Sequence, residues 1–165
     1  MDILKKLDAF LNKVEGAITI ILLLVMLVLG FWQVVLRNVF SGGLVWGDVL
    51  LRHLVLWIGF FGATLAASQE RHISIDAISR FLPPRFRSGL HVITNLFSAV
   101  ICYFFFRAAV TFIGFEVESR HTVYGEIPAL YAEIVIPVGF GLLVVHFLLR
   151  MVVRADEALE GRAAA

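Results

Sequence analysis

Charged side chains inside long apolar stretches are the residues of this sequence best suited to chemistry. Arg52, Arg107 and Glu133 each interrupt such a stretch, and a charge at the centre of a membrane helix costs roughly 2.5–3.5 kcal/mol on insertion scales. We expect them to form one ion-pair network, with Asp48 as a further member, because opposite charges in a low dielectric offset part of each other's desolvation cost. The alternatives are pairing with a partner subunit, snorkelling to the interface, or a site for a translocated ion.

Histidines offer a second chemistry, because two imidazoles can hold a haem between membrane helices. His91 and His146 lie toward the same end of their stretches and His53 toward the other, so only the first two could share a cofactor; the alternative is that they are hydrogen-bonded structural groups. A single cysteine, Cys102, excludes an intrachain disulfide and a cysteine-based metal site. Without a nucleophile elbow, a His-Glu-x-x-His motif or a phosphate-binding glycine loop, we expect no enzyme and no cofactor or metal bound by this chain.

Four apolar stretches must position these residues. Of the 165 residues 60% are hydrophobic, and the mean hydropathy is +0.91, more than one water-soluble core could bury. A helix rises about 1.5 Å per residue and the hydrocarbon layer is about 30 Å thick, so a span needs roughly twenty residues. The stretches cover residues 17–36, 49–67, 90–113 and 130–153. We predict an all-α membrane protein of four transmembrane helices, forming a single domain over residues 1–165.

Two further segments are predicted to be amphipathic helices on the inner membrane surface. Over residues 2–14 apolar side chains recur at helical spacing opposite charged ones, and over residues 73–82 a shorter stripe ends at Pro83-Pro84. The alternative is that each segment only extends the neighbouring span. Within the fourth span, Pro137 is the residue that could produce a kink.

Lys and Arg flank the four spans unequally, which predicts the orientation. Membrane proteins keep these residues on the cytoplasmic side, so both termini and the middle loop are expected to be cytoplasmic. A net charge of +1 gives no reason to expect a nucleic-acid partner. The residues on the first side are Lys5, Lys6, Lys13, Arg71, Arg80, Arg85, Arg87, Arg150, Arg154 and Arg162, and those on the other are Arg37 and Arg120.

Three short motifs stand out in and around the first two spans. They are Gln33 with Arg37, Trp46-x-Asp48-x-x-x-Arg52, and Gly62-Ala63 followed by His72-Ile73-x-Ile75-Asp76. Together they resemble the small membrane subunit, of the DctQ or SiaQ type, of tripartite ATP-independent periplasmic (TRAP) transporters. The resemblance covers roughly residues 15–155, and the sequence departs from the family in Gln69-Glu70-Arg71, where a basic-glycine pair is common.

The resemblance implies a small scaffold subunit of a secondary transporter in the bacterial inner membrane. It would form a heterodimer with a large membrane subunit that carries the substrate and sodium sites and moves as an elevator. A periplasmic binding protein would deliver an organic acid, such as a C4-dicarboxylate or a sialic acid. The alternatives are a haem-bearing or quinone-linked anchor of a redox complex, and a small independent transporter or assembly factor.

Candidate site residues are of two kinds. Small residues of the second span allow close approach of another helix, inside this chain or outside it, and His72 and Asp76 either fix a turn or contact the large subunit. The outer loops are expected to help dock the delivery protein. Interface or structural candidates are Arg37, Trp46, Asp48, Arg52, Gly59, Gly62, Ala63, His72, Asp76, Arg107 and Glu133, and docking candidates are Leu44, Glu118, Arg120 and Tyr124.

Overall fold

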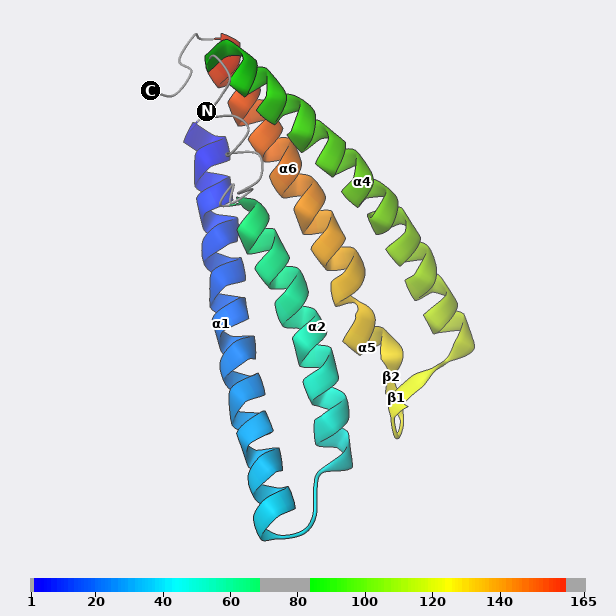
Figure 1. The fold of residues 1–165 in the computed structure, drawn as a ribbon. Coiled ribbons are helices and arrows are strands. Elements are labelled where there is room, and N and C mark those ends of the chain that lie inside the picture. The colour runs from blue at the N-terminus through cyan, green and yellow to red at the C-terminus, as the bar shows by residue number, and fades with distance from the viewer. Residues whose placement is uncertain (1, 69–83, 160–165) are drawn as a thin grey trace.

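Four long helices account for most of the fold in the computed structural model, which describes residues 2–68 and 84–159. The helices converge at the end where α1 begins and α6 ends, here called the termini end, and spread apart toward the opposite, hairpin end (Figure 1). The elements are α1 (Asp2–Val39), α2 (Val45–Ser68), α4 (Pro84–Ser119), β1 (Thr122–Tyr124), β2 (Ile127–Pro128), α5 (Ala129–Glu133) and α6 (Val135–Leu159).

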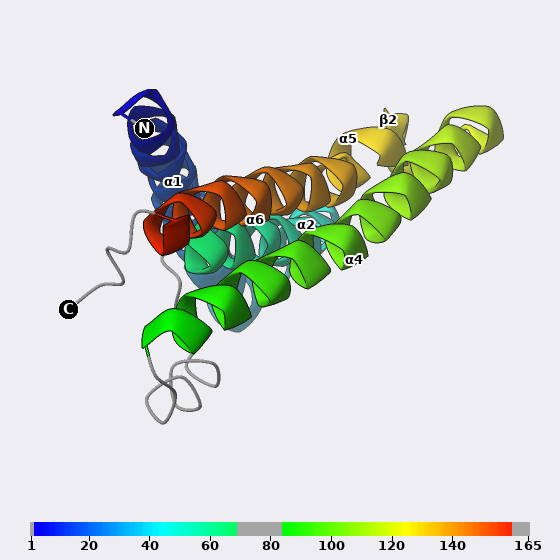
Figure 2. The same ribbon diagram turned by 90° about the horizontal axis from the view of Figure 1, so that it is seen from above.

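The spatial order of the helices is α1, α2, α6, α4, and the main contacts join neighbours in that order. α1 and α4 lie on opposite sides of the central pair (Figures 1 and 2). Four helical segments are long and apolar enough to cross a membrane: Lys6–Val39, Val45–Ser68, Gly89–Ser119 and Ala129–Val153. This confirms the four expected spans, and large hydrophobic side chains are exposed along all four helices.

Residues 2–14 do not form a separate surface helix but continue directly into the first span as part of α1. No proline interrupts the chain between this segment and the span, and one glycine, Gly16, is tolerated within a helix. Leu7, Phe10 and Val14 are exposed, with Phe10 at 64%, whereas Glu15 is buried. The face that carries Glu15 therefore packs inward, and these three apolar side chains face outward. The other expected surface helix, over residues 73–82, lies outside the described residues.

The fourth span consists of two helices, because Ile134 separates α5 from α6. Pro137 has no N–H group to donate to the carbonyl oxygen of Glu133, four residues earlier. The neighbouring bonds persist, since Ile134 N donates to Leu130 O at 3.0 Å and Val138 N donates to Ile134 O at 3.3 Å. The expected kink therefore occurs where the proline removes one rung of the ladder.

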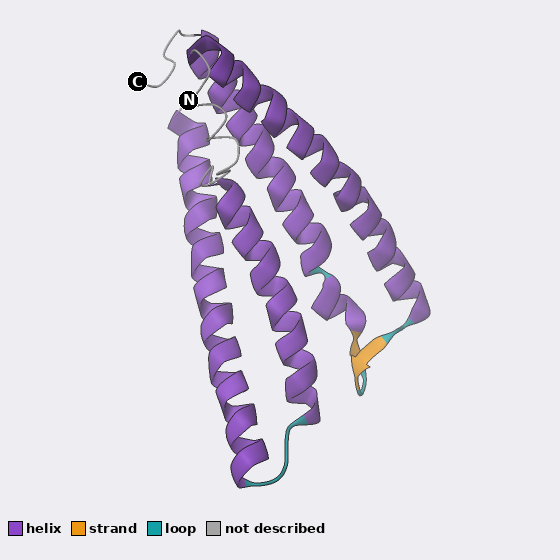
Figure 3. Ribbon diagram, viewed as in Figure 1, coloured by secondary structure: helices purple, strands orange, loops and turns teal. Residues whose placement is uncertain are grey.

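A short β-hairpin precedes this span, and the sequence patterns did not predict it (Figure 3). β1 and β2 pair antiparallel, with Tyr124 opposite Ile127. Gly125 adopts a φ of 58° in the tight turn, a conformation that glycine adopts without steric cost. Ala129 N donates to His121 O at 2.9 Å and closes the base of the hairpin.

The core between α2, α4 and α6 is small and built from compact side chains. Ala67, Ala99 and Phe147 form a buried cluster. Farther toward the hairpin end, the ring of Phe140 stacks on Phe105 with 5.2 Å between centroids and meets the edge of Phe60 at the same separation. Such aromatic pairs add about 0.5–1.5 kcal/mol beyond area burial, so α6 is held between α2 and α4 over much of its length.

Candidate functional site

A buried glutamine closes the connection between α1 and α2 at the hairpin end. The Gln33 side chain is 4% exposed. Its Nε2 donates to Leu44 O at 2.8 Å and to Asp48 Oδ1 at 3.0 Å, and its Oε1 accepts a hydrogen bond from Leu44 N at 2.9 Å. Asp48 also forms an ion pair with Arg37. Because a primary amide offers donors and an acceptor together, these motif residues hold the start of α2 against α1.

Gly47 belongs to this connection for a steric reason. A Cβ atom there would lie 2.9 Å from Gln33 Nε2 and 3.1 Å from Gln33 Cδ, whereas a Cβ atom at Gly59 would meet nothing within 4 Å. The missing side chain at Gly47 therefore allows Gln33 to reach the loop. Gly47 was not singled out as a structural position from the sequence, because its contact partner lies in another helix.

We predict that Gly47→Ala lowers the free energy of unfolding of the detergent-solubilised chain by about 1 kcal/mol, since displacing Gln33 outweighs the gain in helix propensity. The matched control is Gly59→Ala in the same helix, which should stabilise the chain by about 0.5–1 kcal/mol. Unfolding followed by circular dichroism measures both variants. Equal stabilisation by the two substitutions would contradict the proposed role of Gly47.

A second polar cluster joins α1, α2 and α6 at the termini end. His146 is fully buried and Glu15 is 2% exposed. His146 Nε2 lies 2.9 Å from Glu15 Oε1, and His146 Nδ1 lies 3.4 Å from Asp8 Oδ1. Arg150 Nη2 lies 3.1 Å from Asp8 Oδ2 and donates to the carbonyl oxygen of Ser68 at the end of α2. Acidic groups of α1 thus face basic groups of α6, which is the pairing that buried polar groups require.

This second polar cluster was not predicted from the sequence, and it corrects two interpretations. Asp8 was placed on the exposed face of a surface helix, whereas it faces α6. His146 was weighed as a haem ligand with His91, but both of its ring nitrogens face carboxylate oxygens of α1. The available signal was the recurrence of polar residues Asp8, Asn12 and Glu15 on one helical face of the segment that leads into the first span.

The network expected among Arg52, Arg107 and Glu133 is not formed. Both arginine side chains are exposed, neither takes part in an ion pair among the described residues, and Asp48 pairs with Arg37 instead. Glu133 is half-buried on α5, and its Oε2 has no hydrogen-bond partner in the described part of the chain. The three residues lie on three different elements, and the helix order keeps α2 and α4 on separate sides of α6.

The small residues of the second span divide between two faces of α2. Ala67 packs in the buried cluster with Ala99 and Phe147. By contrast, Gly59 and Ala63 are exposed, and Cβ atoms added at Gly59 or Gly62 would meet nothing within 4 Å. Most of the expected close-approach face is therefore open, and none of the described residues packs closely against it.

The remaining candidates gather at the hairpin end or lie outside the described residues. Glu118, Arg120 and Tyr124 are exposed around the hairpin, and Trp46 is 42% exposed at the start of α2. Leu44 is half-buried, with its backbone engaged by Gln33. His72 and Asp76 fall in the segment that the structure does not describe.

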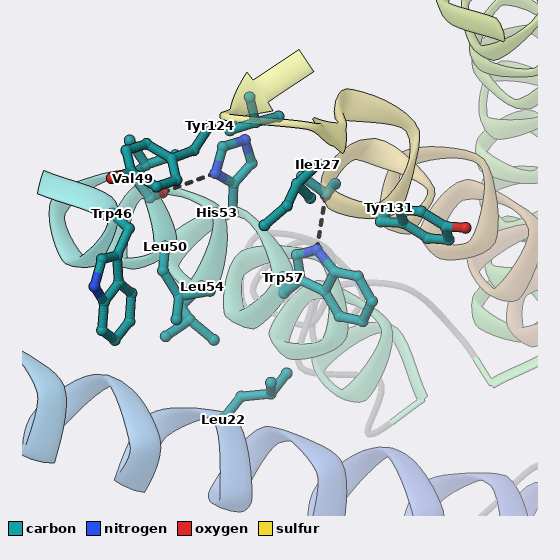
Figure 4. Close-up of a pocket in the computed structure, with 12 residues that line it drawn as sticks. Leu22, Trp46, Val49, Leu50, His53, Leu54, Trp57, Tyr124, Ile127 and Tyr131 are labelled. Carbon is teal, nitrogen blue, oxygen red and sulfur yellow. Dashed lines mark hydrogen bonds between the residues drawn. The ribbon is translucent and has the colours of Figure 1, made fainter. Parts of the chain in front are cut away.

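An apolar cavity of about 380 Å³ opens at the hairpin end between α1, α2, the hairpin and α5. Leu22 of α1 lies on one side and the hairpin residues Tyr124 and Ile127 on the other (Figure 4). Trp57 borders the cavity and donates from Nε1 to Ala132 O at 2.8 Å. This bond links α2 to α5. The described residues that line the cavity include His53 but no Asp, Glu, Lys or Arg.

Comparison with known proteins agrees with the resemblance seen in the motifs. Residues 8–157 match the family described as the DctQ component of tripartite ATP-independent periplasmic transporters. A protein of Haemophilus influenzae whose name describes a TRAP transporter small permease protein is 33% identical over 100 residues, which are 61% of this chain and 62% of that protein. The match thus spans about three fifths of that relative's length.

Two further relatives extend the comparison. The sialic acid TRAP transporter small permease protein SiaQ of Vibrio cholerae is 26% identical over 121 residues, which cover 73% of this chain and 67% of that protein. The isethionate TRAP transporter permease protein DctMQ of Oleidesulfovibrio alaskensis is 25% identical over 155 residues, which are 88% of this chain and 24% of that longer protein. With the family match over residues 8–157 and four helices able to span a membrane, the chain is a multi-pass membrane protein that belongs to the DctQ family, the small membrane subunits of TRAP transporters.

Proposed function

We propose that this chain is the scaffold subunit of a TRAP transporter, anchoring the static part of a large permease that carries the substrate and the coupling sodium ions. The observation that carries the proposal is the open face of α2, where Gly59 and Ala63 are exposed and no helix in the described part of the chain covers them. Small residues let helix backbones approach closely, and in a membrane such packing drives association. The face is therefore suited to a helix of the large permease.

The arrangement of the helices supports a static role. The chain forms an open array with much apolar surface exposed. Polar clusters fix α1 to α2 at one end and α1 to α6 at the other. A subunit whose helices are joined at both ends can anchor the static part of a partner that moves elsewhere, because its own helices have little freedom to shift. Arg52, Arg107 and Glu133 are then available for pairing with that partner.

The hairpin end is proposed to face the periplasm and to help dock the binding protein that delivers the solute. Support comes from the distribution of Lys and Arg along the sequence, because α1 begins and α6 ends at the opposite end and most Lys and Arg residues that flank the spans belong to that side. The solute is proposed to be an organic acid, the class to which the sialic acid named for the Vibrio cholerae relative belongs. Because the hairpin end is proposed to face the periplasm, the membrane is proposed to be the bacterial inner membrane.

Site-specific photo-crosslinking in cells with an active transporter tests the proposal. A photoreactive amino acid at Ala63 should form an adduct with a large permease, and one at Tyr124 an adduct with the periplasmic binding protein. The same group at Val28, which is 69% exposed on α1, serves as a lipid-facing control and should yield neither.

Each labelling site tests a separate part of the proposal. Absence of a permease adduct at Ala63 during active transport would reject the scaffold face. An adduct of Tyr124 with a cytoplasmic protein would reverse the orientation, and no adduct at Tyr124 with the binding protein would reject the docking role.

A further inference from the structure

The cavity at the hairpin end extends along α2, is bordered by several elements and is open on one side. Its lining on α2 runs from Trp46 to Trp57, which at about 1.5 Å per residue corresponds to roughly 16 Å. Leu22 of α1 and Ala132 of α5 contribute further walls, and the hairpin covers one side (Figure 4). These walls distinguish the cavity from the flat exposed surfaces of the other helices.

The few polar groups near the cavity are already used or lie at its rim. Trp57 Nε1 donates to Ala132 O at 2.8 Å, and His53 Nδ1 lies 2.8 Å from Val49 O. The remaining lining consists mainly of leucine, valine, isoleucine and aromatic carbon, with Tyr124 and Tyr131 at the hairpin side. An apolar cavity that is left unfilled deprives its lining atoms of van der Waals contacts, so an apolar group that enters it gains them.

The position of the cavity identifies what is available to fill it. Its α1, α2 and α5 residues all lie within segments that are long and apolar enough to cross a membrane. At this depth the surrounding medium is hydrocarbon, and tyrosine and tryptophan rings beside it are the groups that prefer the boundary with lipid headgroups. An apolar space that extends along α2 and has aromatic rings beside it suits an acyl chain whose headgroup stays at the surface.

We infer that this cavity binds one acyl chain of a membrane phospholipid in the leaflet at the hairpin end. The chain lies along α2 between Leu22 and the hairpin and completes the packing of the hairpin against α2. The bound lipid is thus a structural component of the hairpin end of the molecule. This inference does not depend on the large permease or on the orientation of the chain in the membrane.

Tryptophan fluorescence can test this directly, because the three tryptophans of the chain sample different surroundings. Trp57 lines the cavity, whereas Trp32 is 52% exposed on α1 and is not part of the lining. Two full-length variants are prepared, one with Trp57 alone (Trp32→Phe, Trp46→Phe) and one with Trp32 alone (Trp46→Phe, Trp57→Phe). Phospholipid brominated in its acyl chains is titrated into each detergent-solubilised chain.

Quenching of Trp57 should saturate when about one lipid is bound per chain, as expected for a single concave site, whereas quenching of Trp32 should rise with the bulk lipid fraction. Filling the cavity with Val49→Phe in the Trp57 variant should remove the saturable phase. Val55→Phe, at a residue 60% exposed outside the cavity lining, should leave it intact. Parallel, unsaturated quenching of Trp57 and Trp32 would overturn the inference even if a filling variant failed to fold.

A second measurement separates lipid from a protein occupant. The Trp57 variant is purified with its partner subunits and titrated in the same way. Retained saturable quenching supports a resident lipid. Loss of that quenching in the assembled complex would show that a segment of a partner fills the cavity, which overturns the inference.

Discussion

His146→Leu should be the most destabilising single substitution at the termini end, lowering the free energy of unfolding by roughly 3–5 kcal/mol, because removal of one partner leaves a buried polar group uncompensated. The orphaned group is the Glu15 carboxylate, whose Oε1 lies 2.9 Å from His146 Nε2 in a residue only 2% exposed. Unfolding of the solubilised chain, followed by circular dichroism, gives the change.

A double variant makes this prediction specific to the pair. His146→Leu combined with Glu15→Leu should recover most of the lost stability, since replacing both members of a buried pair by apolar groups is often neutral. His121→Leu is the matched control, because His121 lies on the surface at the opposite end with its side chain 67% exposed. A His146→Leu variant as stable as the parent, or a double variant no better than the single one, would contradict the prediction.

Gly139→Leu should produce the other large effect, a loss of about 3 kcal/mol or more through overpacking between α2 and α6. A Cβ atom at Gly139 would lie 2.4 Å from Phe60 Cδ1 and 2.8 Å from Phe60 Cγ. The substitution must therefore push the helices apart or displace Phe60 from Phe140, whose ring it meets edge-on. Chemical unfolding of the solubilised chain measures the loss.

The control for this prediction is Gly114→Leu on α4. Gly114 is exposed, and an added Cβ atom would meet nothing within 4 Å, so a side chain there projects into lipid or detergent. The Gly114 variant should match or exceed the parent in stability. Similar losses in both variants would show that glycine flexibility, and not the approach of α6 to Phe60, limits the stability of these helices.

The two polar clusters explain which faces of the helices turn toward one another. In hydrocarbon an apolar face gains little by turning inward, whereas polar groups gain much by meeting one another. The segment before the first span shows this inversion, because exposed Phe10 faces outward while Asp8 and Glu15 face α6. In water-exposed surroundings such an amphipathic pattern indicates a surface helix. In this chain the same pattern belongs to a helix that packs through Asp8 and Glu15.

The sequence by itself determined the number of membrane spans, the motifs of the family and the proline that interrupts the fourth span. Length and hydropathy suffice for the spans, because each helix satisfies its own backbone hydrogen bonds within one continuous segment. Pro137 acts within a single turn of helix, so its effect is also local.

Only the tertiary structure decided which polar groups meet. The Glu15–His146 pair joins residues 131 positions apart, and Arg37 is the partner of Asp48, where the sequence had favoured Arg52 and Arg107. It also decided that Gly139 rather than Gly59 is pressed against a neighbouring helix. The physical reason is the same in each case. Residue type fixes the cost of leaving a group unpaired in the membrane, but the rotation and order of the helices fix which partner is within reach.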